Sequence, residues 1–190
     1  MKKIFLAGLL SLFLLGIFSL NGVAQDQVDM QVNMAENLAV RGGFSYISLS
    51  EVENEAPDNG IGFYLGPEYD FNEKATGILQ FENIAASEAG VDINARGIGA
   101  QLAYDVYTVN EIDIAIRGGA GYYFSGNYDG ENLEASPSLK AGTGVSLGAE
   151  GNMNLNLNCL YRSLEMDYED KDDSLDLSGL EIGGSVSYFF

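Results

Sequence analysis

The sequence contains no histidine and no tryptophan, and it has only one cysteine and three prolines. Without histidine, the Ser-His-Asp triad and histidine-ligated metal centres are excluded. A carboxylate-only mechanism remains conceivable, but paired carboxylates in this chain are better explained as members of ion pairs. We therefore predict that the protein is not an enzyme and needs no cofactor. The single cysteine, Cys159, cannot form an internal disulfide, and we expect it to be a small apolar residue on a strand face.

Basic residues are also scarce. The chain has nine Lys and Arg residues against 28 Asp and Glu residues, a formal net charge of −19. A charge of this sign and size argues against nucleic acid as a partner, and against direct docking on anionic lipid headgroups. It does not by itself indicate an enzymatic function.

The N-terminus has the order of features found in a secretory signal peptide. Lys2 and Lys3 precede an apolar run over residues 4–20, and the small residues Gly22 and Ala24 follow. We predict that residues 1–24 are the signal peptide, cleaved after Ala24. An N-terminal membrane anchor is the alternative, because a run of about 17 apolar residues is the lower limit for spanning a bilayer. No cysteine follows the run, so a lipoprotein-type lipid anchor is not supported.

The rest of the chain is rich in glycine, tyrosine and phenylalanine, and its pattern predicts an all-β fold. Residues 25–38 are polar and lack a clear period, which favours a short N-terminal extension. Strand-like segments and turn signals then alternate over residues 39–190. We predict eight strands, at residues 39–50, 60–71, 76–87, 93–107, 112–126, 138–151, 154–168 and 175–190.

Period-2 alternation is clearest in the second segment, and the first, fourth and eighth segments repeat it. One face of the second segment carries Ile61, Phe63, Leu65, Pro67, Tyr69 and Phe71, and the other carries Gly62, Tyr64, Gly66, Glu68 and Asp70. In the seventh segment the apolar residues fall on both parities, with Leu155, Leu157, Cys159 and Tyr161 on one and Leu160, Leu164, Met166 and Tyr168 on the other. In the eighth segment the apolar parity changes between Leu177 and Leu180, next to Gly179. A β-bulge, or a change of environment above a membrane, would each explain these changes.

The connections favour a transmembrane barrel. Those after the second, fourth and sixth segments are tight, the one after the third is intermediate, and those after the first, fifth and seventh are longer and acidic. Short turns alternating with long loops, with both chain ends on the short side, are typical of such barrels. A soluble sandwich or lipocalin-like barrel would instead turn the apolar face inward.

In a lipid-embedded barrel the polar face points inward, and it contains scarce arginines together with carboxylates. We predict a lumen charge network formed by Arg41, Glu68, Glu82, Asp105, Arg117, Arg162 and Glu181. An eight-stranded barrel is just wide enough for its side chains to fill it, which favours a structural network. A narrow polar path or gate is the alternative. Arg96 shares the parity of the lipid-facing residues, so we place it at the rim.

Two acidic loops could bind a divalent cation weakly through grouped oxygen atoms. The carboxylates in question are Asp129, Glu131, Asp167, Glu169, Asp170, Asp172 and Asp173. Their spacing is not that of an EF-hand, and a run of charge is usually only a solvated surface. Weak cation binding that helps contact with anionic surface lipid is the functional hypothesis for these loops.

The chain ends in an alternating strand with Tyr188 and a terminal Phe190. This end resembles the C-terminal signature by which barrel-assembly machinery recognises outer-membrane barrels. With the leader and eight segments, residues 39–190 resemble the small outer-membrane barrels of the OmpA/OmpX type. The resemblance implies an outer-membrane location, contact with outer-membrane lipid and lipopolysaccharide, and a monomer. It also implies that enzymatic barrels rely on a catalytic histidine, which this chain lacks.

Three functional hypotheses follow. The first is a structural or surface-interaction barrel with a plugged lumen and acidic extracellular loops. The second is a narrow channel or carrier for small or hydrophobic molecules. The third is a soluble periplasmic ligand-binding barrel.

Overall fold

The computed structural model describes residues 37–49, 57–88, 90–148 and 152–190, and all the regular structure there is β-strand. The eight long strands are β1 (Leu38–Leu49), β2 (Asn59–Asn72), β3 (Ala75–Glu88), β4 (Val91–Val109), β5 (Ile112–Tyr128), β7 (Ser136–Gly148), β8 (Met153–Asp167) and β10 (Gly179–Phe189). Two short strands, β6 (Glu131–Leu133) and β9 (Ser174–Asp176), lie in loops. Among these residues no helix is long and apolar enough to cross a membrane. The predicted signal peptide and nearly all of the predicted extension lie outside the described residues.

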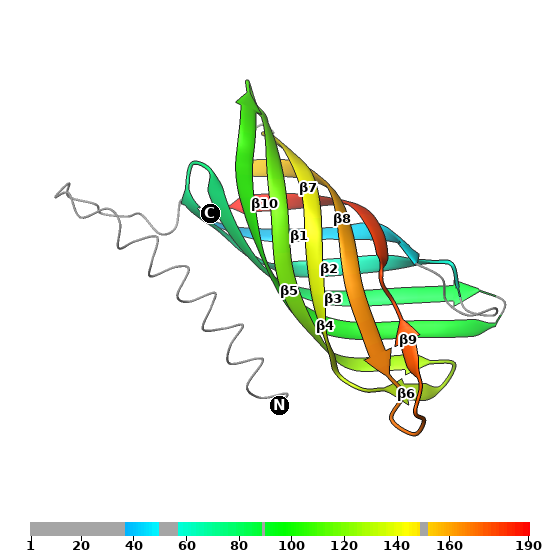
Figure 1. Cartoon of the computed structure of the whole chain (residues 1–190). Helices are drawn as coiled ribbons and strands as arrows, with labels where there is room; N and C mark the ends of the chain where they lie inside the picture. Colours follow the sequence, from blue (N-terminus) through cyan, green and yellow to red (C-terminus); the bar gives the residue numbers. More distant parts are fainter. Residues whose placement is uncertain (1–36, 50–56, 89, 149–151) are drawn as a thin grey trace.

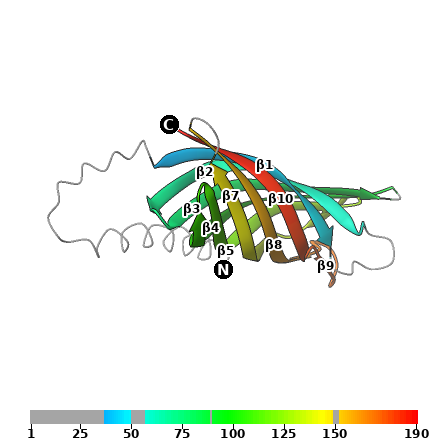
Figure 2. The same ribbon diagram turned by 90° about the horizontal axis from the view of Figure 1, so that it is seen from above.

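The long strands pair antiparallel with their neighbours and close into a barrel (Figures 1 and 2). Closure joins the last strand, β10, to the first, β1, from Ala39 opposite Phe189 to Leu49 opposite Gly179. The short strands continue the register of long ones: β6 and β7 together form one interrupted partner of β5, and β9 and β10 form one interrupted partner of β8. The prediction of an eight-stranded antiparallel barrel is confirmed.

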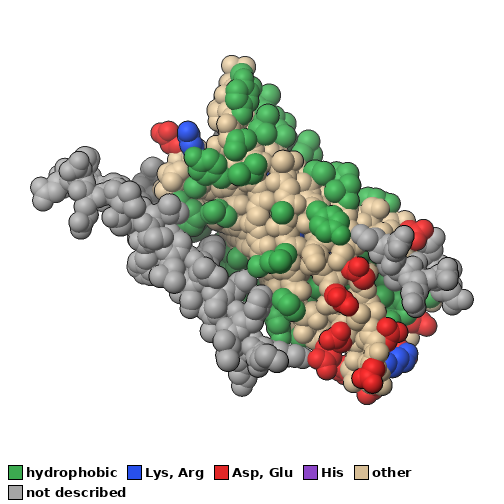
Figure 3. Space-filling model, in the orientation of Figure 1, with side chains coloured by type: hydrophobic (Ala, Val, Ile, Leu, Met, Phe, Trp, Pro, Cys, Tyr) green, Lys and Arg blue, Asp and Glu red, His purple; other side chains and the backbone are tan. Residues whose placement is uncertain are grey.

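The outer face of the barrel is apolar along most of its length. Side chains at alternate positions point away from the axis, and many large apolar ones are exposed there, including Phe44, Phe63, Leu65, Ile116, Leu139, Leu157 and Ile182. Cys159 is exposed on the same face of β8. Figure 3 shows apolar side chains over much of the visible wall and acidic ones gathered at the end where β6 and β9 lie. An apolar exterior suits lipid and argues against a soluble binding barrel.

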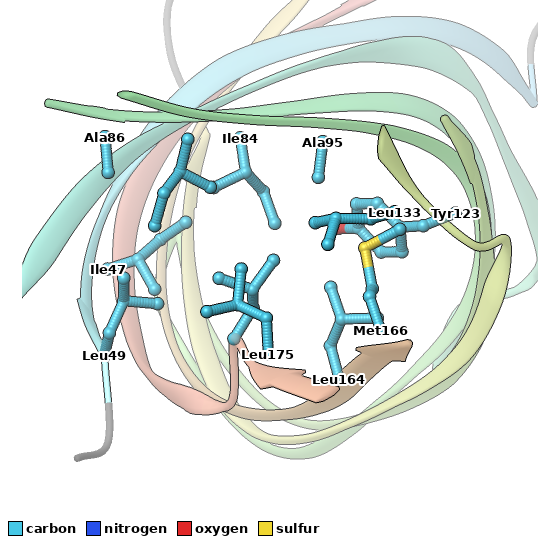
Figure 4. Close-up of a cluster of buried hydrophobic side chains, with 12 residues drawn as sticks. Ile47, Leu49, Ile84, Ala86, Ala95, Tyr123, Leu133, Leu164, Met166 and Leu175 are labelled. Carbon is cyan, nitrogen blue, oxygen red and sulfur yellow. The ribbon is translucent and has the colours of Figure 1, made fainter. Parts of the chain in front are cut away.

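The inner face is divided into two halves of opposite character. Toward the tight turns it carries buried charged and polar side chains. Toward the long loops it carries a close-packed apolar cluster, drawn in Figure 4, whose side chains point toward the barrel axis. The apolar cluster consists of Ile47, Leu49, Ile84, Ala86, Ile93, Ala95, Tyr123, Leu133, Leu164, Met166, Leu175 and Leu177. The expectation of a polar inner face therefore holds for only half of the barrel.

This division explains the parity changes in the last two long strands. Strand β8 alternates between buried and exposed positions from Asn156 to Asp167, and its pairings with β7 and β10 show no register shift. Apart from Leu160, the inward residues are polar from Asn156 to Arg162 and apolar from Leu164 onward, and the outward residues change from Tyr161 to Ser163. In the same way, Leu177 is buried inside and Leu180 is exposed outside. A bulge is thus the wrong explanation at both places, and a change of environment on both faces is the right one.

Candidate functional site

The centre of the interior holds a cluster of two cations and two anions contributed by four strands. Lys140 Nζ lies 2.8 Å from Glu82 Oε2 and 3.2 Å from Glu181 Oε2. Arg162 Nη2 is paired with Glu181 and lies 3.8 Å from Glu82 Oε2. The hydroxyl of Tyr123 donates a hydrogen bond of 2.5 Å to Glu82. All five side chains are buried, so the charges are removed from water and depend on one another.

Glycine at facing positions makes room for these long side chains. A Cβ atom on Gly99 would lie 2.7 Å from Glu82 Oε1, closer than real Cβ contacts. Gly99 therefore leaves the room that Glu82 needs, because a narrow barrel can hold large inward side chains only opposite small ones.

A second polar cluster lies nearer the tight turns and links four strands. Arg41 donates from Nη1 to Glu68 Oε2 at 2.9 Å and from Nη2 to Asn158 Oδ1 at 3.3 Å. Glu68 also accepts from the Ser187 hydroxyl at 3.1 Å, and Ser187 accepts from Asn156 at 3.1 Å. This cluster is satisfied by partners within the barrel and has no exposed member.

Beside this second cluster is a cavity of about 130 Å³ at the turn end of the interior. Arg117 and Asp105 both line it, together with Arg41 and Glu68. Arg117 is 6% exposed, and among the described residues it forms no ion pair within 4.0 Å. Its guanidinium crosses the interior close to Gly144, where a Cβ would lie 2.9 Å from the Arg117 Cζ atom.

No protein-family model matches the sequence, and no curated protein matches it. Solved structures do match. The chain has the fold of the small eight-stranded outer-membrane β-barrels.

Three solved structures have this fold. Neisserial surface protein A aligns with a TM-score of 0.67 at 17% identity, covering 80% of this chain and 97% of that one. OprG of Pseudomonas aeruginosa aligns with a TM-score of 0.58 at 15% identity, covering 85% and 99%. Ail, the attachment invasion locus protein of Yersinia pestis, aligns with a TM-score of 0.53 at 19% identity, covering 82% and 99%. The likeness to this barrel fold spans nearly the whole of each of these proteins.

The barrel brings most of the predicted network residues inside, but into separate groups. Glu82, Arg162 and Glu181 meet in the central cluster, whereas Arg41 and Glu68 pair nearer the turns. The other two predicted members, Arg117 and Asp105, line the cavity without forming an ion pair.

Arg96 lies outside the barrel network. It is exposed on the outer wall and donates from Nε to Asn83 Oδ1 at 3.3 Å. It lies at the loop-side end of the apolar surface, in agreement with the expected rim position.

Sequence reasoning missed Lys140 and Tyr123, both central to the barrel interior. Lys140 alternates with exposed Pro137, Leu139 and Ala141 in β7, and this parity was a usable signal. Tyr123 follows Tyr122 in β5, and a register shift between β4 and β5 occurs beside it. That shift makes its direction unreadable from alternation alone.

The C-terminal residues of the predicted assembly signal lie on the outer face at the turn end. Tyr188 and Phe190 are about half exposed, and their rings pack edge to face with centroids 5.7 Å apart. Their role in assembly stays a prediction.

The acidic loops form two hairpins at the loop end of the barrel. Hairpins β5–β6 and β8–β9 touch through a bridge between Leu133 and Tyr168, and Lys171 Nζ lies 2.5 Å from Glu131 Oε2. Among the described residues no group of three or more His, Cys, Asp or Glu side chains is placed to hold a metal ion. Cation binding by these loops therefore stays a hypothesis without a preformed site in this part of the chain.

The exposed ion pair between the hairpins is expected to add little stability. Both Lys171 and Glu131 side chains are about half exposed, at 53% and 47%, so water and salt screen their attraction. In a double-mutant cycle of Lys171→Met and Glu131→Gln, we expect a coupling energy below about 1 kcal/mol. Thermal unfolding in detergent would measure it, and a coupling of about 2 kcal/mol or more would contradict the solvated geometry.

Proposed function

We propose that this chain is an outer-membrane barrel, closed to solutes, with a structural or surface-interaction role. The observation that carries the proposal is the filling of the interior by two layers in series. The first is the central charge cluster of Glu82, Lys140, Arg162 and Glu181, and the second is the apolar cluster above it. Because an eight-stranded barrel is just wide enough for its side chains, two filled layers leave no continuous water path.

The connections support an orientation in the membrane. Both described chain ends and the tight connections at 72–75 and 109–112 lie at one end, and the β6 and β9 hairpins lie at the other. In outer-membrane barrels the short turns face the periplasm and the long loops face outside. The acidic hairpins would then be displayed at the cell surface. Ail, a structural neighbour, is named for attachment and invasion, a kind of role that surface display serves.

The apolar exterior supports the proposal that the barrel lies among outer-membrane lipid and lipopolysaccharide. Outer-membrane lipid and lipopolysaccharide would surround the apolar band, and the barrel-assembly machinery would recognise the strand that ends in Tyr188 and Phe190. Export through the predicted signal peptide at residues 1–24 belongs to the same proposal. The closed barrel supplies its own strand pairing all round, which suits a monomer.

Planar-bilayer recording on the folded mature chain tests whether the interior is closed. We expect no discrete conductance steps, with folding verified by different gel mobilities of boiled and unboiled samples. Steps from the wild-type barrel would instead favour the narrow channel.

Variants of the two layers make this test sharper. Lys140→Ser with Arg162→Ser removes the cations of the charge cluster, and Leu164→Ala with Met166→Ala thins the apolar cluster. Each pair alone should stay closed because the other layer remains, and only the fourfold variant should conduct. Conductance from either pair alone would show that the two layers do not act in series.

A further inference from the structure

At the turn end of the interior, a cation and an anion line one small cavity without meeting. Arg117 reaches the cavity from β5 and Asp105 from β4, and no ion pair within 4.0 Å joins them. Opposite charges in a poorly solvated interior attract strongly. Their separation therefore leaves a gap between a donor and an acceptor, open to a ligand that carries both complementary groups.

Of Arg117 and Asp105, Arg117 is the more unusual, because it is a buried charge without an ion-pair partner among the described residues. Buried guanidinium groups are normally paired, because an uncompensated buried charge is costly. Arg117 is 6% exposed, and its Nε has no hydrogen-bond acceptor among the described residues. The neighbouring Arg41 does have a partner, since it is bonded to Glu68 at 2.9 Å. Glu68 is thus already engaged by another cation, and Arg117 lines the cavity without a carboxylate partner among the described residues.

Asp105 differs from the other aspartates that line this cavity. Asp70 accepts a hydrogen bond from Thr76 at 2.6 Å, and Asp113 accepts one from Thr108 at 2.7 Å. The carboxylate of Asp105 has no such hydrogen bond within the described part of the chain. Asp105 is thus, with Glu73, a cavity-lining carboxylate that accepts no hydrogen bond there, and the Arg117 guanidinium has no ion-pair partner within the same residues.

The charge of the cavity wall selects the class of ligand. Five carboxylates and two guanidiniums line the cavity, so its net acidic wall would repel a simple anion, whereas a ligand with both charges can pair with Arg117 as well as with a carboxylate. A cavity of about 130 Å³ has the room of roughly four water molecules. We propose that it binds a small zwitterion of the α-amino acid type, with the carboxylate on Arg117 and the ammonium on Asp105. The site opens at the turn end, so the proposal requires the barrel fold but no passage through the barrel.

Binding to the folded mature chain in detergent micelles tests the proposal with three probes of similar size. L-alanine carries both charges, acetate carries only the anion, and ethylamine carries only the cation. By NMR titration we expect saturable L-alanine binding with a Kd on the order of 1 mM, and at least about tenfold weaker binding of the other two. Arg117→Gln and Asp105→Asn should each weaken L-alanine binding about tenfold or more. The matched control, Arg96→Gln on the outer wall, should leave it unchanged.

Three results would overturn the proposal: no saturable L-alanine binding at about 100 mM, acetate or ethylamine binding as tightly as L-alanine, or wild-type affinity in both site variants. If Arg117→Gln does not fold, as judged by equal gel mobilities of boiled and unboiled samples, Gly144→Ala takes its place in the titration. The added methyl group would press on the Arg117 guanidinium, displace it, and weaken L-alanine binding without removing the charge. Conductance does not enter this test, so it can fail while the closed-barrel proposal stands, and the reverse also holds.

Discussion

Replacing Arg162 with methionine is expected to destabilise the folded barrel by about 3–5 kcal/mol. Arg162 is 1% exposed and pairs with Glu181 while lying 3.8 Å from Glu82. Its removal leaves two buried carboxylates that share Lys140 as their remaining cation. Breaking a buried network from one side is costly because the remaining charge cannot return to water. Urea unfolding in lipid vesicles, followed by gel mobility, would measure the loss.

Two further variants separate this effect from the loss of any arginine. Arg96→Met removes an exposed arginine of the outer wall, where we expect a change below about 1 kcal/mol. Adding Glu181→Gln to Arg162→Met neutralises one of the uncompensated carboxylates and should restore part of the stability. If Arg162→Met were as mild as Arg96→Met, the central cluster would have to be solvated, contrary to its burial.

The strand count and the direction of most side chains could be predicted from the sequence because the signals are local. Alternation in residues 61–71 distinguishes the two faces of β2, and the tight connections mark where the chain reverses. The predicted bounds of the first five strands and of the seventh are within two residues of the structure, whereas the sixth was predicted to end three residues late and the eighth to begin four residues before β10. Arg41, Glu82 and Arg162 were predicted to lie in the lumen because arginines are scarce and lie on strands together with carboxylates, and all three are buried inside the barrel.

Which charges meet across the interior could not be predicted, because those contacts depend on how the barrel closes. Glu82 and Lys140 are 58 positions apart in sequence, and they touch only because β3 and β7 face one another across the lumen. Parity also cannot separate a paired cation from an unpaired one. Arg41 and Arg117 have the same parity signal, yet Arg41 is bonded to Glu68 and Arg117 faces the cavity.

The apolar cluster was missed for a different reason. Period-2 alternation distinguishes two faces of a strand, but not inside from outside. Where the inner face becomes apolar and the outer face becomes polar, side chains still alternate between the two faces. Only the face that carries the apolar residues changes. In β8 this happens between Arg162 and Leu164 inside and between Tyr161 and Ser163 outside. In the sequence alone, such an exchange cannot be distinguished from a β-bulge that shifts the alternation by one residue.

The same exchange predicts where the lipid ends. Some outward residues lie just on the loop side of the last large apolar residue on the outer face of their strand; these are Ser48, Asn59, Asn83, Arg96, Ser125 and Ser163. Beyond them the wall is polar outside and apolar inside, as in a water-soluble barrel. We infer that the loop-side part of the barrel stands in water above the membrane, with its own apolar core holding it together. The upper membrane boundary then passes near Tyr161 and Ser163 on β8.

Arginine substitutions on either side of this boundary should locate it, because they should change the free energy of unfolding by different amounts. Leu157 and Ser163 are both exposed on the same face of β8. Leu157→Arg puts a charge among the apolar side chains and should cost about 2–4 kcal/mol in a bilayer, whereas Ser163→Arg should cost about 0–1 kcal/mol. Urea unfolding in lipid vesicles measures both, and Leu155→Arg gives a second position inside the band. Equal costs at 157 and 163 would move the boundary toward the loops, and no cost at 157 or 155 would mean that the apolar wall does not face lipid.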